Sequence, residues 1–129
     1  MTNRTAAHLI AEAKAHVAHL TAEEVAAALE DQDVLLVDLR EANERVQHGV
    51  IAGAVHAPRG MLEFYADPTS AYFHPDFDPA RQTILYCASG GRAALAAETL
   101  TRLGYTRVSY LKGGLHAWVE AGHGVKPIE

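Results

Sequence analysis

The stretch from Ile84 to Arg92 combines residue types that are suited to thiol chemistry. Cys87, the only cysteine of the chain, follows three apolar or aromatic residues and precedes two small residues and two glycines. This order predicts a buried strand, a tight loop and a helix from Arg92, with the thiol at the carboxyl end of the strand. A helix N-terminus presents unpaired N–H groups and positive potential, which favour the nucleophilic thiolate. We therefore expect Cys87 to act as a nucleophile.

A buried cysteine also has a simpler explanation. Cysteine is among the most buried residue types, and a cysteine that closes a strand is in most proteins inert packing. Gly90 and Gly91 favour the catalytic interpretation, because glycine lets the backbone curl closely around the sulfur. The charge of Arg92 supports it too. The sequence places no histidine beside Cys87 as in cysteine proteases, and it leaves a pairing in space open.

Composition narrows the class of protein. A chain of 129 residues that is 49% hydrophobic suits one domain with a single core. The net charge of −5 argues against nucleic acid and anionic membranes as partners. A lone cysteine cannot form an internal disulfide, and no apolar run approaches the roughly 20 residues that span a bilayer. The alanine-rich N-terminal run carries charged residues and so lacks the apolar core of a signal peptide. We expect a soluble, cytoplasmic protein.

The apolar pattern predicts strands that alternate with helices. Short strands are expected at Val34–Val37, just before Pro58, at Thr83–Tyr86 and at Val108–Leu111. A second helix is expected to begin at Thr21, which starts a capping box. The other helices are expected at Ala6–Leu20, Glu41–Gln47, Gly60–Ala66 and Arg92–Leu103, and after Lys112. This alternation predicts an α/β fold with a parallel sheet covered by helices on both faces. Ligands of such sheets bind at the carboxyl ends of the strands, where Asp38, Arg40 and Cys87 are placed.

Two segments allow more than one interpretation. We expect residues 1–20 to form a helical extension before a domain at 21–129, which is an appendage, an exposed partner surface, or both. His16 and His19 share a turn of this extension but lack a third ligand, which favours a solvated face over a metal site. Asp67–Pro79 holds three prolines and three aromatics, which predicts a long ordered loop. This loop is either a lid on the core or a wall of the substrate pocket.

Four stretches together resemble the rhodanese family of sulfurtransferases. They are Val37–Glu41, His48–Val55, Cys87–Arg92, and Gly104–Val108 with Leu111–Trp118. Each motif is weak alone, but the four occur in order at suitable spacing between about Thr21 and Gly122. The resemblance implies a three-layer α/β/α fold with a mainly parallel central sheet flanked by helices.

The resemblance also implies a mechanism. The Cys87 thiolate would take a sulfane sulfur from a donor such as thiosulfate and hold it as a persulfide. An acceptor would then remove the sulfur: cyanide, a small-molecule thiol or a protein thiol. Backbone N–H groups of the active-site loop would stabilise the terminal sulfur; the loop residues are Ala88, Ser89, Gly90, Gly91 and Arg92. Asp38 and Arg40 would form a supporting charged pair. No cofactor or metal is expected.

The loop departs from the family pattern in one respect. Ala88 and Ser89 stand where the best-known thiosulfate-using members have cationic residues, which leaves the physiological donor open. Ser89 can still donate a hydrogen bond. Arg59 and Lys112 are candidates to supply positive charge from neighbouring loops, and the alternative is that both are ordinary surface cations.

Two other functions compete with sulfur transfer. A related fold supports the cysteine-dependent chemistry of phosphatases and arsenate reductases. The phosphate-cradling loop of those enzymes is one residue longer than the four residues between Cys87 and Arg92. The shorter loop favours a single sulfur atom over a tetrahedral phosphate. The second alternative is a regulatory binding module without turnover, although modules of this kind often lack the cysteine that this chain keeps.

Overall fold

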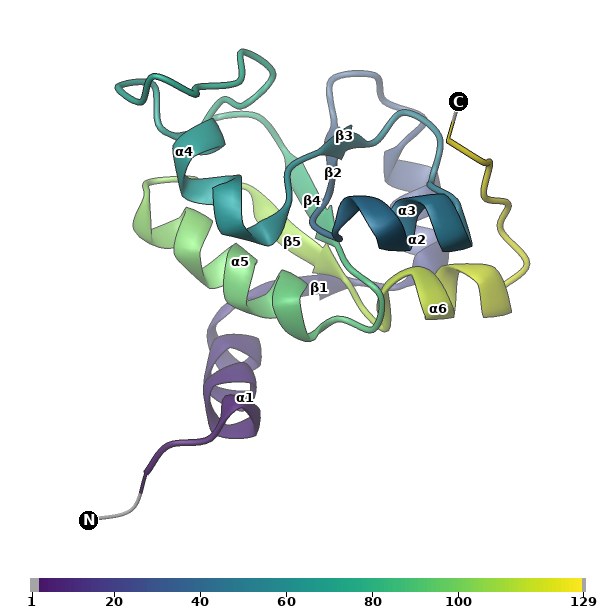
Figure 1. Cartoon of the computed structure of the whole chain (residues 1–129), viewed down its shortest axis with the longest axis horizontal. Coiled ribbons are helices and arrows are strands. Elements are labelled where there is room, and N and C mark those ends of the chain that lie inside the picture. The colour runs from purple at the N-terminus through teal and green to yellow at the C-terminus, as the bar shows by residue number, and fades with distance from the viewer. Residues whose placement is uncertain (1–2, 129) are drawn as a thin grey trace.

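Five parallel strands form the centre of the molecule, in the order β1-β5-β4-β2-β3 (Figure 1). The computed structural model describes residues 3–128. The strands are β1 (Ala18–Leu20), β2 (Leu35–Asp38), β3 (Val55–His56), β4 (Thr83–Tyr86) and β5 (Val108–Leu111). The α-helices are α1 (Ala6–His16), α2 (Ala22–Ala28), α3 (Ala42–His48), α4 (Leu62–Ala66), α5 (Gly91–Arg102) and α6 (Gly114–Glu120), and a 3-10 turn covers Arg59–Met61.

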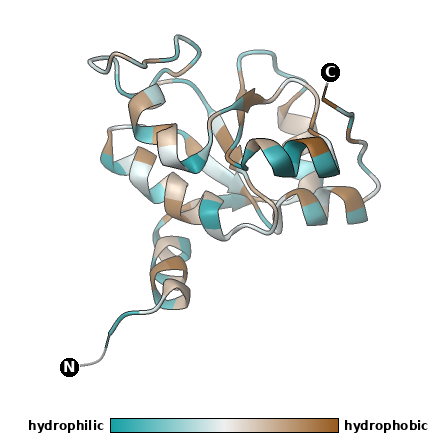
Figure 2. Cartoon of the chain, viewed as in Figure 1, coloured by the Kyte–Doolittle hydropathy of each residue, from teal (hydrophilic) through white to brown (hydrophobic). Residues whose placement is uncertain are grey.

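Helices cover both faces of the sheet, as the sequence predicts. Successive side chains of a strand point to opposite faces. Leu35 and Leu85 therefore pack with buried residues of α1, α4 and α5 on one face. Leu36 and Ile84 pack with buried residues of α2 and α6 on the other face. The result is a three-layer α/β/α fold. Figure 2 shows both hydrophilic and hydrophobic residues on the helices, as expected when one face of a helix packs against a sheet and the other faces solvent.

Helix α5 packs against the sheet mainly through small side chains. Ala93, Ala96, Ala97 and Leu100 are fully buried and recur at helical spacing. Alanine favours the helix and lets its axis approach the strands closely. Just beyond the helix, Gly104 has a φ of +102°, the left-handed conformation that glycine adopts without strain. The predicted stop of this helix at Gly104 is confirmed.

The predicted helix over Ala6–Leu20 is wrong in its last turn. Helix α1 ends at His16, and Val17 is extended. Residues 18–20 form the edge strand β1, in which Ala18 pairs with Ser109 and Leu20 with Leu111 of β5. Apolar spacing suggests a helix there because alanine and leucine suit one, but pairing with β5 overrides that local preference.

Helix α1 packs against the start of α5. Ala13 is fully buried in the core between the two helices. A Cβ built on Gly91 would lie 3.1 Å from Cδ1 of Ile10, so the two helices approach closely at the end of the Cys87 loop. His16 lies at the end of α1, whereas His19 lies on β1 and stacks edge-on against Tyr110. The two histidines thus do not share a helical turn, and residues 3–128 contain no group of three possible metal ligands.

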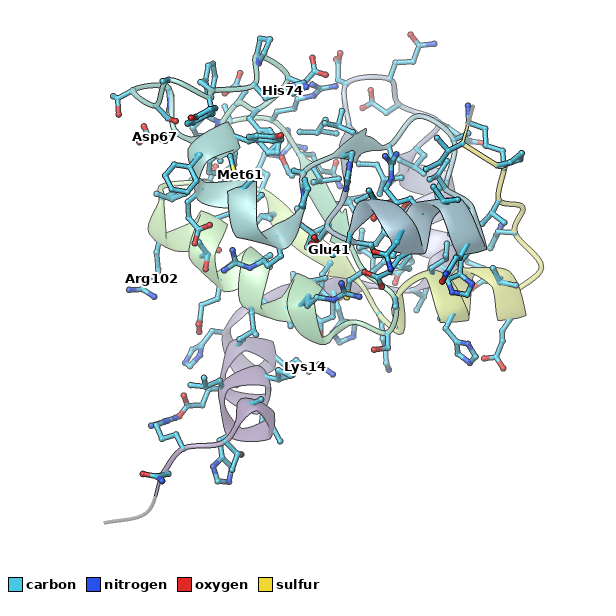
Figure 3. All side chains as sticks on the ribbon, in the orientation of Figure 1. Lys14, Glu41, Met61, Asp67, His74 and Arg102 are labelled. Carbon is cyan, nitrogen blue, oxygen red and sulfur yellow. The ribbon has the colours of Figure 1, made fainter. Side chains whose placement is uncertain are left out.

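The Asp67–Pro79 segment covers the core beside α4. Phe77 is buried in the core, and the ring of His74 packs between those of Tyr65 and Phe77. In Figure 3 the labelled Asp67 and His74 lie over α4, at the opposite end of the view from α6. These contacts favour the interpretation of the segment as a lid on the core.

Burial of Ala13 makes a prediction about α1. The substitution Ala13→Asp places a carboxylate between α1 and α5, and we expect it to lower the free energy of unfolding by roughly 2–4 kcal/mol. Ala11→Asp on the exposed side of the same helix is the matched control, with an expected change within about 0.5 kcal/mol. Urea denaturation measures both. Equal stabilities for the two variants would show that α1 is only loosely attached.

Candidate active site

Cys87 begins the loop that joins β4 to α5. Its side chain is 1% exposed and belongs to the core cluster on the α5 face. The backbone N–H of Gly90 donates a hydrogen bond to the Cys87 sulfur over 3.1 Å. Gly90 has a φ of +117°, which an L-residue with a side chain rarely adopts. The glycine therefore lets the loop turn back so that its own N–H faces the sulfur.

The start of α5 contributes further polar groups beside the loop. The first intrahelical bond at this end runs from the N–H of Ala94 to the carbonyl of Gly90. The N–H groups of Gly91, Arg92 and Ala93 precede it and have no partner within the helix. Together with the positive end of the helix dipole, they favour a negative charge at this position. The predicted arrangement of strand, tight loop and helix is confirmed.

The N-terminus of α6 holds the loop from the other side. The N–H of Leu115 donates to the carbonyl of Cys87 over 2.9 Å, and the N–H of His116 donates to the carbonyl of Ala88 over 3.1 Å. A Cβ on Gly114 would lie 2.5 Å from the Cys87 carbonyl oxygen, closer than real contacts allow. Glycine at this position is thus required by the close approach of α6 to the loop. Gly114 lies in the Leu111–Trp118 stretch that resembles the family, but the sequence does not show what this glycine contacts.

Asp38 is the centre of a buried polar network at the end of β2. Its carboxylate accepts hydrogen bonds from Nε and Nη2 of Arg40 at 3.0 and 2.8 Å and from Nε of Arg45 at 3.0 Å. The Tyr86 hydroxyl donates to it over 2.9 Å. Arg40 also donates to the carbonyl of Gly49. The expected contact between Asp38 and Arg40 is present, and both side chains are buried away from solvent.

Opposing effects act on the ionisation of Asp38. Burial alone would raise the pKa of its carboxyl, but the hydrogen bonds and charge of Arg40, with the Tyr86 hydroxyl, outweigh burial and lower the pKa. Burial and the neighbouring Asp38 carboxylate raise the pKa of Tyr86, so its hydroxyl remains a donor. Sequence reasoning missed Tyr86 and Arg45, since an aromatic strand residue and a helix cation carry no distinguishing signal.

Arg92 forms a two-pronged ion pair with Glu44 of α3. The two guanidinium nitrogens lie 2.8 and 2.9 Å from the two carboxylate oxygens. Hydrogen bonds from Arg92 lower the pKa of Glu44 to about 2, and the pair raises the pKa of Arg92. Glu44 also accepts the N–H of Glu41, which is labelled in Figure 3 before α3. Glu44 was missed because it is distant in sequence and resembles any solvent-facing helix residue.

A pocket of about 430 Å³ opens beside the Cys87 loop. It is lined by loop residue Ala88, by α3 and α6, and by the C-terminal tail: Arg40, Glu44, His48, Ala88, Leu115, His116, Val119 and Val125. Two backbone hydrogen bonds between Val50 and Lys126 hold the tail in place. No residue of the Asp67–Pro79 segment lines this pocket.

The remaining predicted residues lie apart from the pocket lining. Ser89 and Lys112 are exposed, and the backbone N–H of Lys112 donates a hydrogen bond to the carbonyl of Leu20 in β1. Arg59 binds the carboxylate of Glu63 and the hydroxyl of Thr99, and so joins α4 to α5. Neither Arg59 nor Lys112 is among the residues that line the pocket. Their role as substrate contacts stays a prediction.

Comparison with known proteins supports the family suggested by these features. The family model described as a rhodanese-like domain matches residues 21–121. A sulfurtransferase from Allochromatium vinosum is 34% identical over 91 residues, 70% of this chain and 77% of that protein. The thiosulfate:glutathione sulfurtransferase of Saccharomyces cerevisiae is 34% identical over 98 residues, 71% of this chain and 69% of that protein. The chain belongs to the rhodanese-like family, which includes sulfurtransferases.

Two solved structures show the same fold over nearly the whole chain. A protein of unknown function from Rhodopseudomonas palustris, described as a possible tyrosine phosphatase, has a TM-score of 0.91 and 35% identity and covers 98% of this chain and 97% of its own. The polysulfide-sulfur transferase homodimer of Wolinella succinogenes has a TM-score of 0.76 and 27% identity, with coverages of 93% and 85%. Among the residues described, no helix is long and apolar enough to cross a membrane.

The close packing of α6 on the loop makes a prediction about Gly114. Gly114→Ala forces a Cβ into the Cys87 and Ala88 backbone at a residue with a φ of +61°. We expect a loss of roughly 1–3 kcal/mol in the free energy of unfolding and a displaced loop. Gly60→Ala, where nothing lies within 4 Å of the added Cβ, is the control. Thermal unfolding measures both, and an unchanged melting temperature for Gly114→Ala would contradict the packing.

The Glu44–Arg92 pair makes a prediction about pH. The pKa of Glu44 is about 2 in the fold against an ordinary 4.5. The stability that the ionised carboxylate contributes is therefore complete above pH 4.5 and is lost as the pH falls toward 2. The difference in free energy of unfolding between the native chain and Glu44→Gln should be constant above this range and shrink below it. Urea titrations at a series of pH values measure the difference, and no decline below pH 4.5 would contradict the assignment.

Proposed function

We propose that the protein is a sulfurtransferase that carries a sulfane sulfur as a persulfide on Cys87. The observation that carries this proposal is the position of the thiol. Its sulfur lies at the end of β4, 3.1 Å from the Gly90 N–H and next to the start of α5. The named sulfurtransferase relatives support the same chemistry.

In the first step, the Cys87 thiolate attacks the outer sulfur of the donor. A new sulfur–sulfur bond forms to Cys87, and the bond between the sulfane sulfur and the rest of the donor breaks. The leaving group departs with the electron pair of that bond; from thiosulfate it is sulfite. The enzyme keeps a persulfide anion, so no external oxidant or reductant is needed.

In the second step, the acceptor attacks the terminal sulfur of the persulfide. Cyanide leaves as thiocyanate, and a thiolate leaves as a new persulfide. In both cases the electron pair of the broken sulfur–sulfur bond returns to Cys87, which regenerates the thiolate. A small thiol is the acceptor class that we favour, and a protein thiol can react in the same way.

The loop stabilises the intermediate through fixed donors. The Gly90 N–H and the unpaired N–H groups of Gly91 and Arg92 are available to the negatively charged sulfur. The hydrogen bonds from α6 to the Cys87 and Ala88 carbonyls hold these donors in place. Arg92 acts mainly by joining the loop to Glu44, since its charge is already paired. A cysteine that must stay a free thiolate suits a reducing compartment such as the cytoplasm.

Phosphate transfer is a second candidate, because the neighbour from Rhodopseudomonas palustris is described as a possible tyrosine phosphatase. A phosphoryl group needs several donors and free positive charge around its oxygens. The loop here is short, and its arginine is bound to Glu44. Sulfur transfer is therefore the function that the site supports better.

The proposal predicts a persulfide on one residue. Protein incubated with thiosulfate or mercaptopyruvate should gain the mass of one sulfur atom at Cys87, and later addition of cyanide should remove it as thiocyanate. We expect Cys87→Ser to abolish both the adduct and the turnover. Intact-protein and peptide mass spectrometry measure the adduct.

A stability control and a rival assay accompany this experiment. The melting temperature of Cys87→Ser is measured beside that of the native chain to show that the variant is folded, because the substitution buries a hydroxyl where the thiol was. Sulfur transfer by Cys87→Ser at the native rate would contradict the assignment. Hydrolysis of an aryl phosphate without any persulfide would favour the phosphatase. The absence of both sulfur transfer and phosphate hydrolysis would favour a binding module.

A further inference from the structure

Four of the eight residues that line the pocket beside the loop are apolar. Leu115 and Val119 of α6 form one wall, and Val125 of the C-terminal tail lies with them in the lining. Val119 is 50% exposed and Val125 39% exposed, so both present apolar surface to an incoming molecule. Ala88, the residue next to Cys87, completes this surface.

The arginines around the pocket are engaged in ion pairs. Arg40 is buried against Asp38, and Arg92 is held by both oxygens of Glu44, so the Glu44 carboxylate in the lining is paired as well. The lining also holds His48 and His116, and the His116 ring lies 3.7 Å from the Glu120 carboxylate. A carboxylate on the co-substrate would lose hydration against the apolar residues, and these paired arginines would not replace that hydration.

We propose that this pocket selects an organic thiol with an uncharged, apolar substituent as the sulfur acceptor, with Val119 and Val125 as its specificity residues. The inference rests on the proposed function, because the acceptor must meet a Cys87 persulfide. The thiolate attacks the terminal sulfur while its substituent packs against Leu115, Val119 and Val125. The volume of about 430 Å³ accommodates a group the size of a phenyl ring.

The test uses the persulfide form of the full chain and two acceptors. Phenylethanethiol and mercaptopropionate share the same thiol-bearing ethyl unit and differ in a phenyl ring or a carboxylate. Each is mixed with protein that has been loaded with sulfur and freed of donor, and mass spectrometry follows the loss of sulfur from Cys87. After correction for the reactivity of each thiol toward a small free persulfide, we expect phenylethanethiol to react about tenfold faster or more.

Variants assign the preference to the pocket. We expect Val119→Ser and Val125→Ser to reduce the phenylethanethiol rate about threefold or more and to leave the mercaptopropionate rate nearly unchanged. Val46→Ser is the control for both substitutions, since Val46 is 71% exposed on α3 and does not line the pocket.

The outcomes separate this inference from the proposed function. Failure to load any sulfur on Cys87 overturns both. Normal loading followed by equal corrected rates for the two acceptors overturns the inference alone. A preference that persists unchanged in Val119→Ser and Val125→Ser also overturns it, because the selection would then lie outside this pocket.

Discussion

The site depends on the hydrogen bonds that the buried carboxylate of Asp38 accepts. This carboxylate accepts hydrogen bonds from Arg40, Arg45 and Tyr86, which lie on the β2–α3 connection, on α3 and on β4. A buried carboxylate without these partners would cost several kcal/mol, so the network is required as a whole. It therefore joins the carboxyl ends of two strands to the helix that follows the first of them.

Helix α3 transmits this constraint to the Cys87 loop. Arg45 binds Asp38 at the sheet, and the adjacent Glu44 binds Arg92 at the start of α5. The helix is thereby held between the carboxyl end of β2 and the Cys87 loop, although none of its residues is buried. Helix α6 supports the loop from its other side through hydrogen bonds to the Cys87 and Ala88 carbonyls. The loop is thus positioned by contacts with two helices that are distant from it in sequence.

The contacts that hold the loop also determine which groups line the pocket. The arginine of the loop serves as a structural link to Glu44. The Glu44 carboxylate remains in the lining, where apolar side chains of α6 and the tail accompany it. The Gly90 N–H of the loop faces the Cys87 sulfur, whereas half of the residues that line the pocket are apolar.

The features of this protein that depend on neighbouring residues were determined by the sequence alone. The thiol at a strand end, the glycines after it, the capping box at Thr21 and the stop of α5 all depend on neighbouring residues, and the structure confirms these local features. Tertiary structure decided the rest. Residues 18–20 became a strand because β5 offered them a partner, Asp67–Pro79 became a cover for the core, and Glu44 met Arg92 across 48 positions of sequence. Contacts between distant segments leave no periodic trace in either segment, because a surface glutamate or an alanine-rich run has the same local pattern whatever it finally touches.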